Sequence, residues 1–565
     1  MNYFKERLID LISKSTNIGK NTLIKIIEVP PDKNLGNFSL PCFKLAKEFK
    51  KSPQEIANNI KEKIRKNDFI SSIEVKSGYL NFSIDKNKLA LFTLKNVLSK
   101  KNNYGKTNIG KNKKVMVEYS SPNTNKPLHL GHVRNDLLGM SVSKILAFNG
   151  YKVIKSSVIN DRGIHICKSM LAYIKWGNDK KPDKKPDHFV GDFYVLFSQK
   201  SKESPELEDE ARDLLHKWEA KDKETLAIWK KMNTWVYQGF NETYKSLGSK
   251  FDKVYYESQI YERGKEIVLK AFKEGIFKDE EGTIMVDLSR FNLPNVILLR
   301  SDKTSLYLTQ DIYLAILKFK EFKLNKSIYV VGNEQNLHFK QLFAILNLLG
   351  YKWYKDCYHL SYGYVSLPSG RMKSREGNVI DADTLIENMI ELAKMELQRR
   401  TKLSKNELEK RSRIIALGAI KFFFIKYETF KDFTFDPKES ISFEGETGPY
   451  IQYTYARACS ILKKNKEKFS KYKTSMLQTN EEQNLIDTIY NFPEVVEDSL
   501  NNYKPSLIGR YLIGLCQQFN EFYQKYPVLK AEKNLKTARL SLIVSVKQVI
   551  LNSSSLLNIE LLDQM

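Results

Sequence analysis

The stretch VMVEYSSPNTNKPLHLGHVRNDLLGMSVSKILAFNG, from Val115 to Gly150, decides the fold of this chain. Its first residues are nearly all apolar, which predicts a strand buried on both faces of a sheet. A polar loop from Ser120 to Pro127 follows, and apolar residues then recur at helical spacing until Gly150 ends the helix. Strand, polar loop and helix form the opening unit of a nucleotide-binding sheet. The helix N-terminus offers phosphate free N–H groups and a positive dipole end.

The polar loop ends in His129-Leu130-Gly131-His132, at the start of the predicted helix. Gly131 has no side chain, so a base or a ribose can approach the backbone closely. The two imidazoles can donate hydrogen bonds to phosphate oxygens as charge builds up in a transition state. A zinc site is a second interpretation, but no third ligand lies nearby at zinc spacing. Two ordinary loop histidines are a third, and the flanking strand and helix favour the phosphate interpretation over both.

His129-Leu130-Gly131-His132 resembles the HIGH signature of class I aminoacyl-tRNA synthetases. The flanking words EYSSPN, from Glu118 to Asn123, and KPL, from Lys126 to Leu128, resemble the arginyl-tRNA synthetases in particular. The resemblance extends over nearly the whole chain. It implies an α/β Rossmann-like catalytic domain, a small α/β N-terminal domain and an all-α C-terminal bundle that binds the anticodon.

The overall composition is consistent with a polyanionic partner. The 565 residues carry a formal net charge of +26, although enrichment in lysine and asparagine accounts for part of that excess. The five cysteines are scattered without a CxxC pair, which indicates reduced thiols in a cytosolic protein. The N-terminus reads as an amphipathic helix rather than a signal peptide, and no apolar run approaches the ~18 residues of a membrane span. We therefore expect a cytoplasmic protein without a membrane segment.

Further polar clusters stand where predicted strands give way to helices. Asn160 to His165 follow the strand that ends at Ile159, Leu306 to Asp311 precede a helix, and Asn333 to His338 follow the buried strand 327–332. In open α/β sheets such positions lie at the C-terminal edge of the strands, where ligands bind.

A basic, glycine-bounded loop runs from Leu367 to Asn378 and resembles the family's KMSKS loop. Cations on such a loop can neutralise charge that moves onto pyrophosphate. The loop departs from the pattern: Arg371 stands at the first lysine, Lys373 replaces the first serine, and Arg375 follows Ser374. In arginyl enzymes that lack the second lysine, a lysine just before HIGH is thought to compensate, and Lys126 stands there. The alternative is a solvated hairpin.

The resemblance implies an arginine–tRNA ligase that uses ATP with Mg²⁺, forms arginyl-adenylate and passes arginine to the terminal adenosine of tRNA(Arg). It also implies attack by the 2′-OH and a need for tRNA in the first step. The implied catalytic residues are Lys126, His129, Gly131, His132, Arg371, Lys373 and Ser374. The implied ATP-binding residues are Pro122, Asn123, His129, Gly131, His132, His338, Tyr364, Val365, Met372 and Lys373. We expect no metal held by protein ligands, and we expect a monomer.

Arginine is expected to bind at Glu118, Ser120, Asn123, Tyr307, Asp311 and Gln335. Glu118, Tyr307 and Asp311 are assigned to the guanidinium, with Asn123 and Gln335 nearer the α-amino group. Glu118 interrupts an apolar strand, where an unpaired acid is costly, so a cationic partner is expected. That partner is either the substrate or a lysine or arginine of the protein itself. Asp311 could instead cap the helix that follows it.

The tRNA-binding residues implied by the resemblance are Asn34, Asn37, Phe38, Tyr453, Arg457 and Arg539. The first three match a polar-aromatic loop that can stack on an unpaired base, or they form an ordinary turn. For most aromatic residues of the C-terminal helices, core packing is the alternative.

Four segments are predicted from these patterns. Residues 1–105 form an N-terminal domain that contacts the tRNA elbow, with a helix from Tyr3, a strand at Ile24–Val29 and a helix around Leu40–Phe49. Residues 106–400 form the catalytic domain, with an inserted helical segment at about 176–290. A connecting segment covers 401–445, and 446–565 bind the anticodon. The Lys180–Pro186 run is predicted to be an exposed loop whose charges serve solvation only.

Two other functions are compatible with parts of the pattern. A cysteinyl-tRNA synthetase also has a helical anticodon domain, but it requires a cysteine/histidine zinc site that this sequence lacks. A non-catalytic RNA-binding relative with a decayed synthetase domain is the other, and the intact His129, His132 and Lys373 argue against it.

Overall fold

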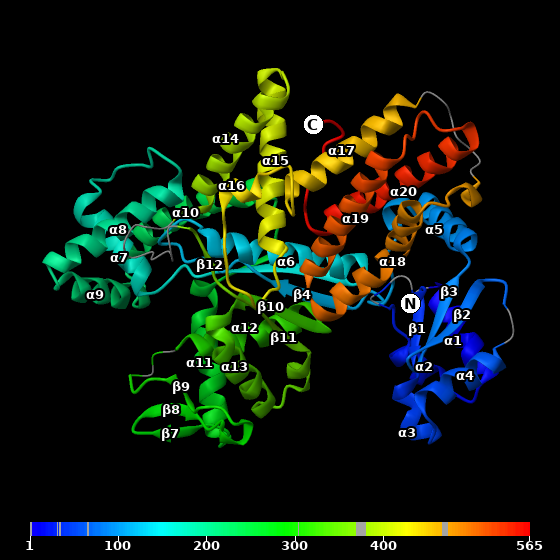
Figure 1. The fold of residues 1–565 in the computed structure, drawn as a ribbon. Helices are drawn as coiled ribbons and strands as arrows, with labels where there is room; N and C mark the ends of the chain where they lie inside the picture. Colours follow the sequence, from blue (N-terminus) through cyan, green and yellow to red (C-terminus); the bar gives the residue numbers. More distant parts are fainter. Residues whose placement is uncertain are drawn as a thin grey trace.

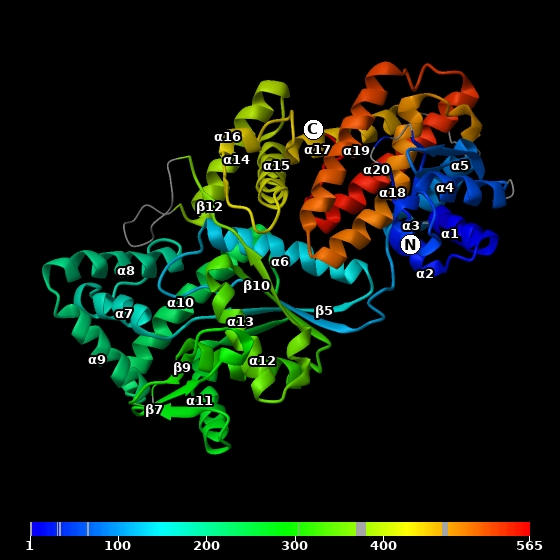
Figure 2. The same cartoon turned by 60° about the horizontal axis from the view of Figure 1, so that its bottom comes forward.

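The computed structural model describes residues 3–30, 32, 35–64, 67–302, 304, 306–368, 380–465 and 473–565. Five of the predicted site residues lie outside these ranges: Asn34, Arg371, Met372, Lys373 and Ser374. Figures 1 and 2 show an α/β body, with a helical projection on one side of it and, on the other, a helical bundle packed against a small N-terminal unit.

A five-stranded sheet forms the centre of the α/β body. Its strands are β4 (Lys114–Glu118), β5 (Lys152–Ile159), β6 (Lys253–Tyr256), β10 (Lys326–Gly332) and β11 (Cys357–Tyr362). They pair in the order β11-β10-β4-β5-β6, and every pair is parallel. Numbered along the chain, this order is 5-4-1-2-3, the doubly wound arrangement. Its strand order reverses between β4 and β10, and ligands bind in the crevice at such a reversal.

Helices cover both faces of this sheet. Helix α6 (Leu130–Phe148) follows β4 and lies on the face toward the helical bundle, whereas α12 (Tyr307–Phe322) and α13 (Asn336–Leu348) lie on the other face (Figures 1 and 2). Gly139 allows α6 to approach β4, because a Cβ there would stand 2.2 Å from the Tyr119 ring. The strand–loop–helix unit predicted from Val115 to Gly150 is confirmed, and Gly150 ends it with a φ of +85°.

A helical projection is inserted in the sequence between β5 and β6. It comprises α7 (Ile164–Trp176), α8 (Pro186–Glu203), α9 (Leu207–Glu219) and α10 (Lys223–Leu247). The predicted insertion at 176–290 is too long, because β6 lies within it and pairs with β5 as the edge strand of the main sheet. After β6 come α11 (Glu257–Lys273) and an antiparallel sheet of β7 (Lys278–Glu280), β8 (Thr283–Val286) and β9 (Val296–Leu299), with a 3-10 turn at Ser289–Phe291.

The remaining elements of the α/β body lead from the sheet into the helical bundle. They are η5 (Asn333–Gln335), η6 (Lys352–Asp356), β12 (Val365–Ser366), α14 (Ala382–Arg400), α15 (Lys405–Ile425), β13 (Phe433–Thr434) and α16 (Pro437–Ser440). The bundle itself contains α17 (Gly448–Lys464), η8 (Thr474–Met476), α18 (Asn480–Asn502), α19 (Pro505–Lys525) and α20 (Lys533–Leu556). The all-α C-terminal region predicted from the sequence is confirmed.

The N-terminal unit packs against this bundle (Figure 1). Its elements are α1 (Tyr3–Ser15), α2 (Lys20–Ile26), β1 (Phe38–Pro41), η2 (Cys42–Leu45), α3 (Ala46–Phe49), α4 (Pro53–Lys63), β2 (Ile70–Lys76), β3 (Tyr79–Ile84), α5 (Lys86–Lys100) and η3 (Lys101–Asn103). The Phe4 N–H donates to the Tyr490 hydroxyl of α18, and the Tyr104 hydroxyl donates to the Ile489 carbonyl. Apolar residues of this unit and of the bundle form one continuous core.

Two predicted elements of this unit agree with the structure only in part. The first half of the predicted strand Ile24–Val29 is the end of helix α2, because in so short an apolar run helical and extended spacing cannot be distinguished. Only Glu28 in its second half pairs in an extended manner, through an antiparallel bridge with Ser39. The predicted helix around Leu40–Phe49 begins as strand β1, which pairs antiparallel with β3 from Phe38↔Phe82 to Pro41↔Tyr79, and only its later residues are helical, as η2 and α3. Tertiary pairing therefore overrides local helical spacing at this position.

Two simpler expectations concern thiols and membrane spans. All five cysteines have free, buried thiols. Among the described residues, no helix has both the length and the apolar character needed to cross a membrane.

Candidate active site and tRNA-binding surface

The two signature histidines meet at the N-terminus of α6. His129 is the N-cap, and its Nδ1 accepts a hydrogen bond from the Gly131 N–H at 3.1 Å. The Nδ1 of His132 accepts one from the His129 N–H, also at 3.1 Å, and the two rings lie 4.0 Å apart between centroids. Because Nδ1 is an acceptor in both neutral rings, the proton of each resides on Nε2. Two N–H donors are thus held at a helix N-terminus.

Both histidines favour the neutral form. Burial and, to a smaller extent, the nearby Lys126 lower the pKa of His129 to about 3. Burial also lowers the pKa of His132 well below its usual value, with contributions from His129 and Lys126. The site can therefore donate hydrogen bonds to an anion without changing its own charge at neutral pH. A Cβ at Gly131 would stand 3.0 Å from the His129 ring, so glycine avoids a tight contact at this position.

Helix α6 also fixes the segment that carries Tyr364 and Val365. Arg134, which is 1% exposed, donates to the carbonyls of Gly363 and Tyr364 and, at 2.8 Å each, to those of Thr429 and Lys431. Val365 lies in β12, which pairs with β13, and the Tyr364 side chain is 47% exposed. These two predicted ATP-binding residues are thereby attached to the helix that begins with the signature histidines.

The predicted loop residues Pro122 and Asn123 lie beside β5. The Pro122 carbonyl accepts a hydrogen bond from the Asn160 N–H at 3.0 Å, and Asn123 forms a bridge with Asn160. Ser120 is buried with a φ of +61°, and its hydroxyl lies 2.8 Å from the Tyr244 hydroxyl. The Ser120 side chain therefore has a partner within the protein, whereas Asn123 is half-buried beside the sheet edge.

Asp311 of α12 and His338 of α13 meet on the face of the sheet opposite α6. His338 Nε2 lies 2.6 Å from Asp311 Oδ2, and 38% of the Asp311 side chain is exposed. Tyr307, one turn earlier on α12, is 70% exposed, and Gln335 is half-buried in η5. Asp311 lies in the second turn of α12, whose N-cap is Leu306, so it does not cap the helix. His338, predicted to bind ATP, contacts the acid assigned to arginine.

Glu118 already has a cationic partner inside the protein. Its carboxylate forms an ion pair with Lys318 of α12, and the Glu118 and Lys318 side chains are 8% and 1% exposed. Burial raises the pKa of Glu118, while Lys318 opposes that effect. Of the two partners left open by the sequence, the structure contains the internal lysine. This placement argues against a direct contact between Glu118 and the guanidinium.

Glu257 is an acid that the sequence reasoning did not identify. It is 5% exposed at the start of α11, directly after β6, and Arg162 lies 4.0 Å away. Burial raises its pKa to about 7, Arg162 lowers it, and the negative charge of Asp311 contributes to the rise. Glu257 and Asp311 therefore lie within electrostatic range of each other. Its position after a strand is the signal that could have found it.

A groove of about 1180 Å³ crosses the C-terminal bundle. Arg457 lies at its wall, with its guanidinium 4.9 Å from the Tyr453 ring centroid and 5.2 Å from that of Tyr523. The other cationic residues that line the groove are Arg411, Lys463, Lys464, Lys530 and Lys547. Exposed aromatic faces among cations are suited to stacking on unpaired bases beside phosphates.

Three predicted tRNA contacts are positioned differently from the expectation. Phe38 is 1% exposed in β1, so its ring belongs to the core. The Asn37 amide donates to Asp487 of α18 and its carbonyl accepts from the Ile84 N–H, which joins the N-terminal unit to the bundle. Arg539 is 6% exposed, and its Nε pairs with Glu482 at 2.7 Å. The structure assigns these side chains to packing and interdomain contacts.

The doubly wound sheet and the histidine pair at the first helix define a class I tRNA synthetase. The family of class I (R) tRNA synthetase catalytic domains matches residues 93–437, more than half of the chain. The arginyl tRNA synthetase N-terminal domain matches residues 2–84, and the DALR anticodon binding domain matches 451–565.

Individual relatives agree along the whole chain. Arginine–tRNA ligase of Treponema denticola is 46% identical over 558 residues, covering 95% of this chain and 94% of the relative. The enzyme of Parabacteroides distasonis is 44% identical, with 94% of each chain covered. Among solved structures, Thermus thermophilus arginyl-tRNA synthetase superposes with a TM-score of 0.85 at 26% identity, covering 99% of this chain and all of that one. The chain belongs to the arginyl-tRNA synthetase family.

Proposed function

We propose that this chain ligates arginine to tRNA(Arg), with ATP phosphates bound at the α6 N-terminus and the arginine guanidinium bound by Asp311 and Glu257. In the first step the arginine carboxylate attacks the α-phosphate of ATP, which yields arginyl-adenylate and pyrophosphate. In the second step the 2′-OH of the terminal adenosine attacks the adenylate carbonyl, and AMP leaves. The ligase activity is supported by curated arginine–tRNA ligases that match 94–95% of the chain.

The observation that carries the ATP assignment is the pair of neutral imidazoles at the α6 N-terminus. Their Nε2–H donors and the helix dipole favour a phosphate group as its charge increases. Lys126 precedes the pair and is close enough to lower the pKa of both histidines, so it adds a positive charge at the same place. Catalysis then rests on positioning and charge stabilisation rather than on a general base.

The arginine assignment rests on two acids with incomplete cationic partners. Asp311 contacts only a histidine at short range among the described residues, and Arg162 lies nearer to Glu219, at 2.7 Å, than to Glu257, at 4.0 Å. A guanidinium presents five donors in a planar fork, which two carboxylates can accept and an ammonium cannot match. Because a site built on such bonds strongly rejects analogues, no editing site is needed.

Mg²⁺ would be bound by ATP and would not be held by protein ligands. The donors at the α6 N-terminus are backbone and imidazole N–H groups, which bind anions and not cations. When bound, Mg²⁺ would supply charge neutralisation to the triphosphate. The tRNA would use the groove around Arg457 and Tyr523, whose cationic and aromatic lining fits an unpaired RNA segment.

The activity is tested by release of AMP from ATP with arginine and tRNA(Arg) supplied together or omitted singly. Arginine should support release and lysine or cysteine should not. AMP release that is equally strong with lysine would contradict the substrate assignment. We propose a cytoplasmic monomer, and light scattering of the purified protein tests its oligomeric state.

A further inference from the structure

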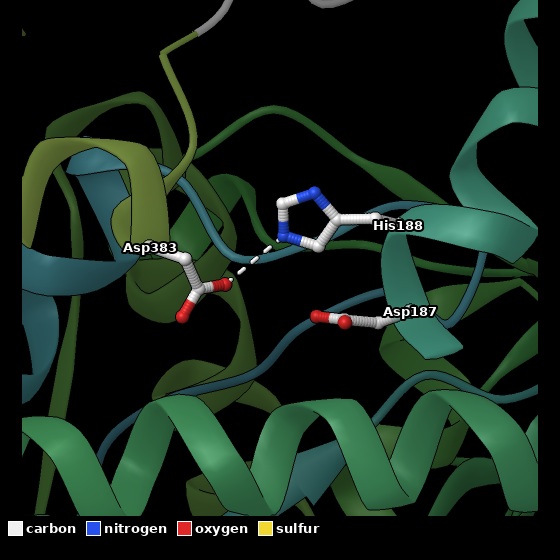
Figure 3. A group of neighbouring side chains, drawn as sticks. All are labelled: Asp187, His188 and Asp383. Carbon is white, nitrogen blue, oxygen red and sulfur yellow. Dashed lines mark hydrogen bonds and ion pairs between the residues drawn. The ribbon is translucent and has the colours of Figure 1, made fainter. Parts of the chain in front are cut away.

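A partly buried ionic cluster joins the helical projection to the start of α14. Lys185 Nζ donates to Asp187 Oδ2 at 3.0 Å, to Thr243 Oγ1 at 2.7 Å and to Asp383 Oδ2 at 2.7 Å. His188 Nε2 lies 3.0 Å from the same Asp383 oxygen. In Figure 3 Asp187 and His188 enter from α8 on one side and Asp383 from α14 on the other. The cluster therefore connects two segments that are 198 residues apart in sequence.

The cluster is completed by an ammonium group. Asp187, His188 and Asp383 present ligand atoms within 4.8 Å of one another, a spacing that a metal ion could use. An ammonium has three N–H donors, and each donor of Lys185 has an acceptor here. A divalent ion bound to these same oxygens would lie against Lys185 Nζ and be repelled by it. We therefore assign the cationic position to Lys185.

The charges of the cluster stabilise one another. Burial acts to raise the pKa of Asp383, but hydrogen bonds from His188 and Lys185 outweigh it and hold that pKa below its usual value. The hydrogen bond to Asp383 raises the pKa of His188, with further contributions from Asp187 and Asp381. Because these opposite charges lie close together and have little contact with solvent, separating them would be costly.

Both sides of the cluster touch the segment that carries the signature histidines. Beside Asp383 on α14, the Ala382 N–H donates to the Leu128 carbonyl at 2.8 Å, and Asp381 forms an antiparallel bridge with His129. On α8, a Cβ at Gly191 would stand 2.9 Å from Pro127 Cδ. The α6 N-terminus is thus held between two elements that Lys185 ties together.

We propose that Lys185 and Asp383 are positioning residues for adenylate formation. They fix α8 of the projection against the start of α14, and through Leu128 and Pro127 they set the position of His129 and His132 relative to ATP. The proposal rests on the assignment of the histidines to ATP phosphates. A small misplacement of such donors reduces the rate of the chemical step more than it reduces substrate affinity.

Three variants test this role by tRNA-dependent ATP–pyrophosphate exchange: Lys185→Met, Asp383→Asn and Lys185→Arg. The first two should lower kcat roughly 10- to 100-fold, with the KM for arginine unchanged. Lys185→Arg keeps the charge and should recover part of the loss. The control is Lys184→Met, in the same loop as Lys185, which removes an exposed ion pair with Asp192 of α8. It should leave exchange unchanged.

Several outcomes would overturn the proposal. One is an unchanged kcat in Lys185→Met and Asp383→Asn proteins that remain folded; another is a lower Tm with exchange intact, which would show a purely structural role. Should Lys185→Met not fold, the milder Asp383→Asn decides. His132→Ala separates the two hypotheses: if it slows exchange and Asp383→Asn does not, only the positioning role fails. Stoichiometric metal that is lost in His188→Gln would also contradict the ammonium assignment.

Discussion

The Glu118 carboxylate of β4 and the Lys318 ammonium of α12 form an ion pair inside the protein. Lys318 lies two turns after Asp311 on the same helix, so the pair fixes the helix that presents Asp311 against the sheet. In the proposed arginine site Glu118 would therefore act through α12, because its own charge is already compensated by Lys318.

Replacing Lys318 by Met should destabilise the protein by about 3–5 kcal/mol, because Glu118 would remain as an unpaired buried carboxylate. The free energy of unfolding in urea measures this loss. The double variant Glu118→Gln with Lys318→Met should recover most of it, since no buried charge remains. The pairing would be contradicted if Glu118→Gln alone abolished arginine binding while leaving stability unchanged.

Replacing His132 by Ala should slow adenylate formation by roughly 10²–10³-fold, because one preorganised donor to the phosphate is lost. Arginine affinity should remain nearly intact, since Asp311 and Glu257 are untouched. Single-turnover activation, measured by rapid quench, separates the two quantities. Arg212→Gln, an exposed ion-pair variant on α9, serves as the control. An unchanged activation rate in His132→Ala would remove the histidine from the mechanism.

Replacing Asp311 by Ala should lower kcat/KM for arginine by roughly 10²–10³-fold, as expected when one partner of a charged pair is removed. The KM for ATP should change little. Glu274→Gln, which replaces an exposed acid at the C-terminal end of α11, is the control. If Asp311→Ala activates arginine as well as the parent does, arginine is recognised elsewhere.

Arginine binding should tighten as the pH rises through 7. Burial raises the pKa of Glu257 from 4.5 to about 7, so the folded protein holds this proton more strongly than the unfolded chain does. This group's contribution to stability therefore decreases as the pH rises from 4.5 toward 7. A bound guanidinium favours the carboxylate form, so binding near pH 7 should release a proton.

Calorimetry in two buffers of different ionisation enthalpy measures that proton release. In Glu257→Gln both the release and the pH dependence between 6 and 8 should disappear, with weaker arginine binding throughout. A pH-independent affinity in the parent protein would show that Glu257 does not face the guanidinium.

The parts of the fold that could be predicted from the sequence are those that depend on local pattern. The β4–α6 unit carries a buried apolar strand, a capping segment and helical spacing within 36 residues, and the structure contains it as predicted. The partners of buried charges could not be predicted in this way. Lys318 lies 200 residues from Glu118, and Lys185 was predicted to serve solvation only, although it bonds Asp383 across the molecule.

The omission of Glu257 has a specific cause. Strand β6 has only four residues, Lys253–Tyr256, and it lay inside the range assigned to a helical insertion. Glu257, at its C-terminal end, therefore does not stand out in the sequence beside the polar residues that follow β4, β5 and β10. Sheet order, which is a tertiary property, is what brings that strand end to the site.

The last prediction concerns the groove of the C-terminal bundle. Tyr523 is 41% exposed and lies beside Arg457, so its ring is available to an unpaired base. Tyr523→Ala should weaken tRNA binding by about 1–3 kcal/mol, the usual contribution of one stacked base. Tyr358, also 41% exposed but on β11, provides the matched control and should have no effect when replaced by Ala. Filter binding at several salt concentrations measures both variants.

The affinity of the groove for tRNA should also fall steeply with salt, and Lys530→Met should reduce the slope of that dependence by about 0.7–0.9, as expected for one lost phosphate contact. If Tyr523→Ala binds tRNA as the parent does and the salt slope of Lys530→Met is unchanged, the RNA does not occupy this groove.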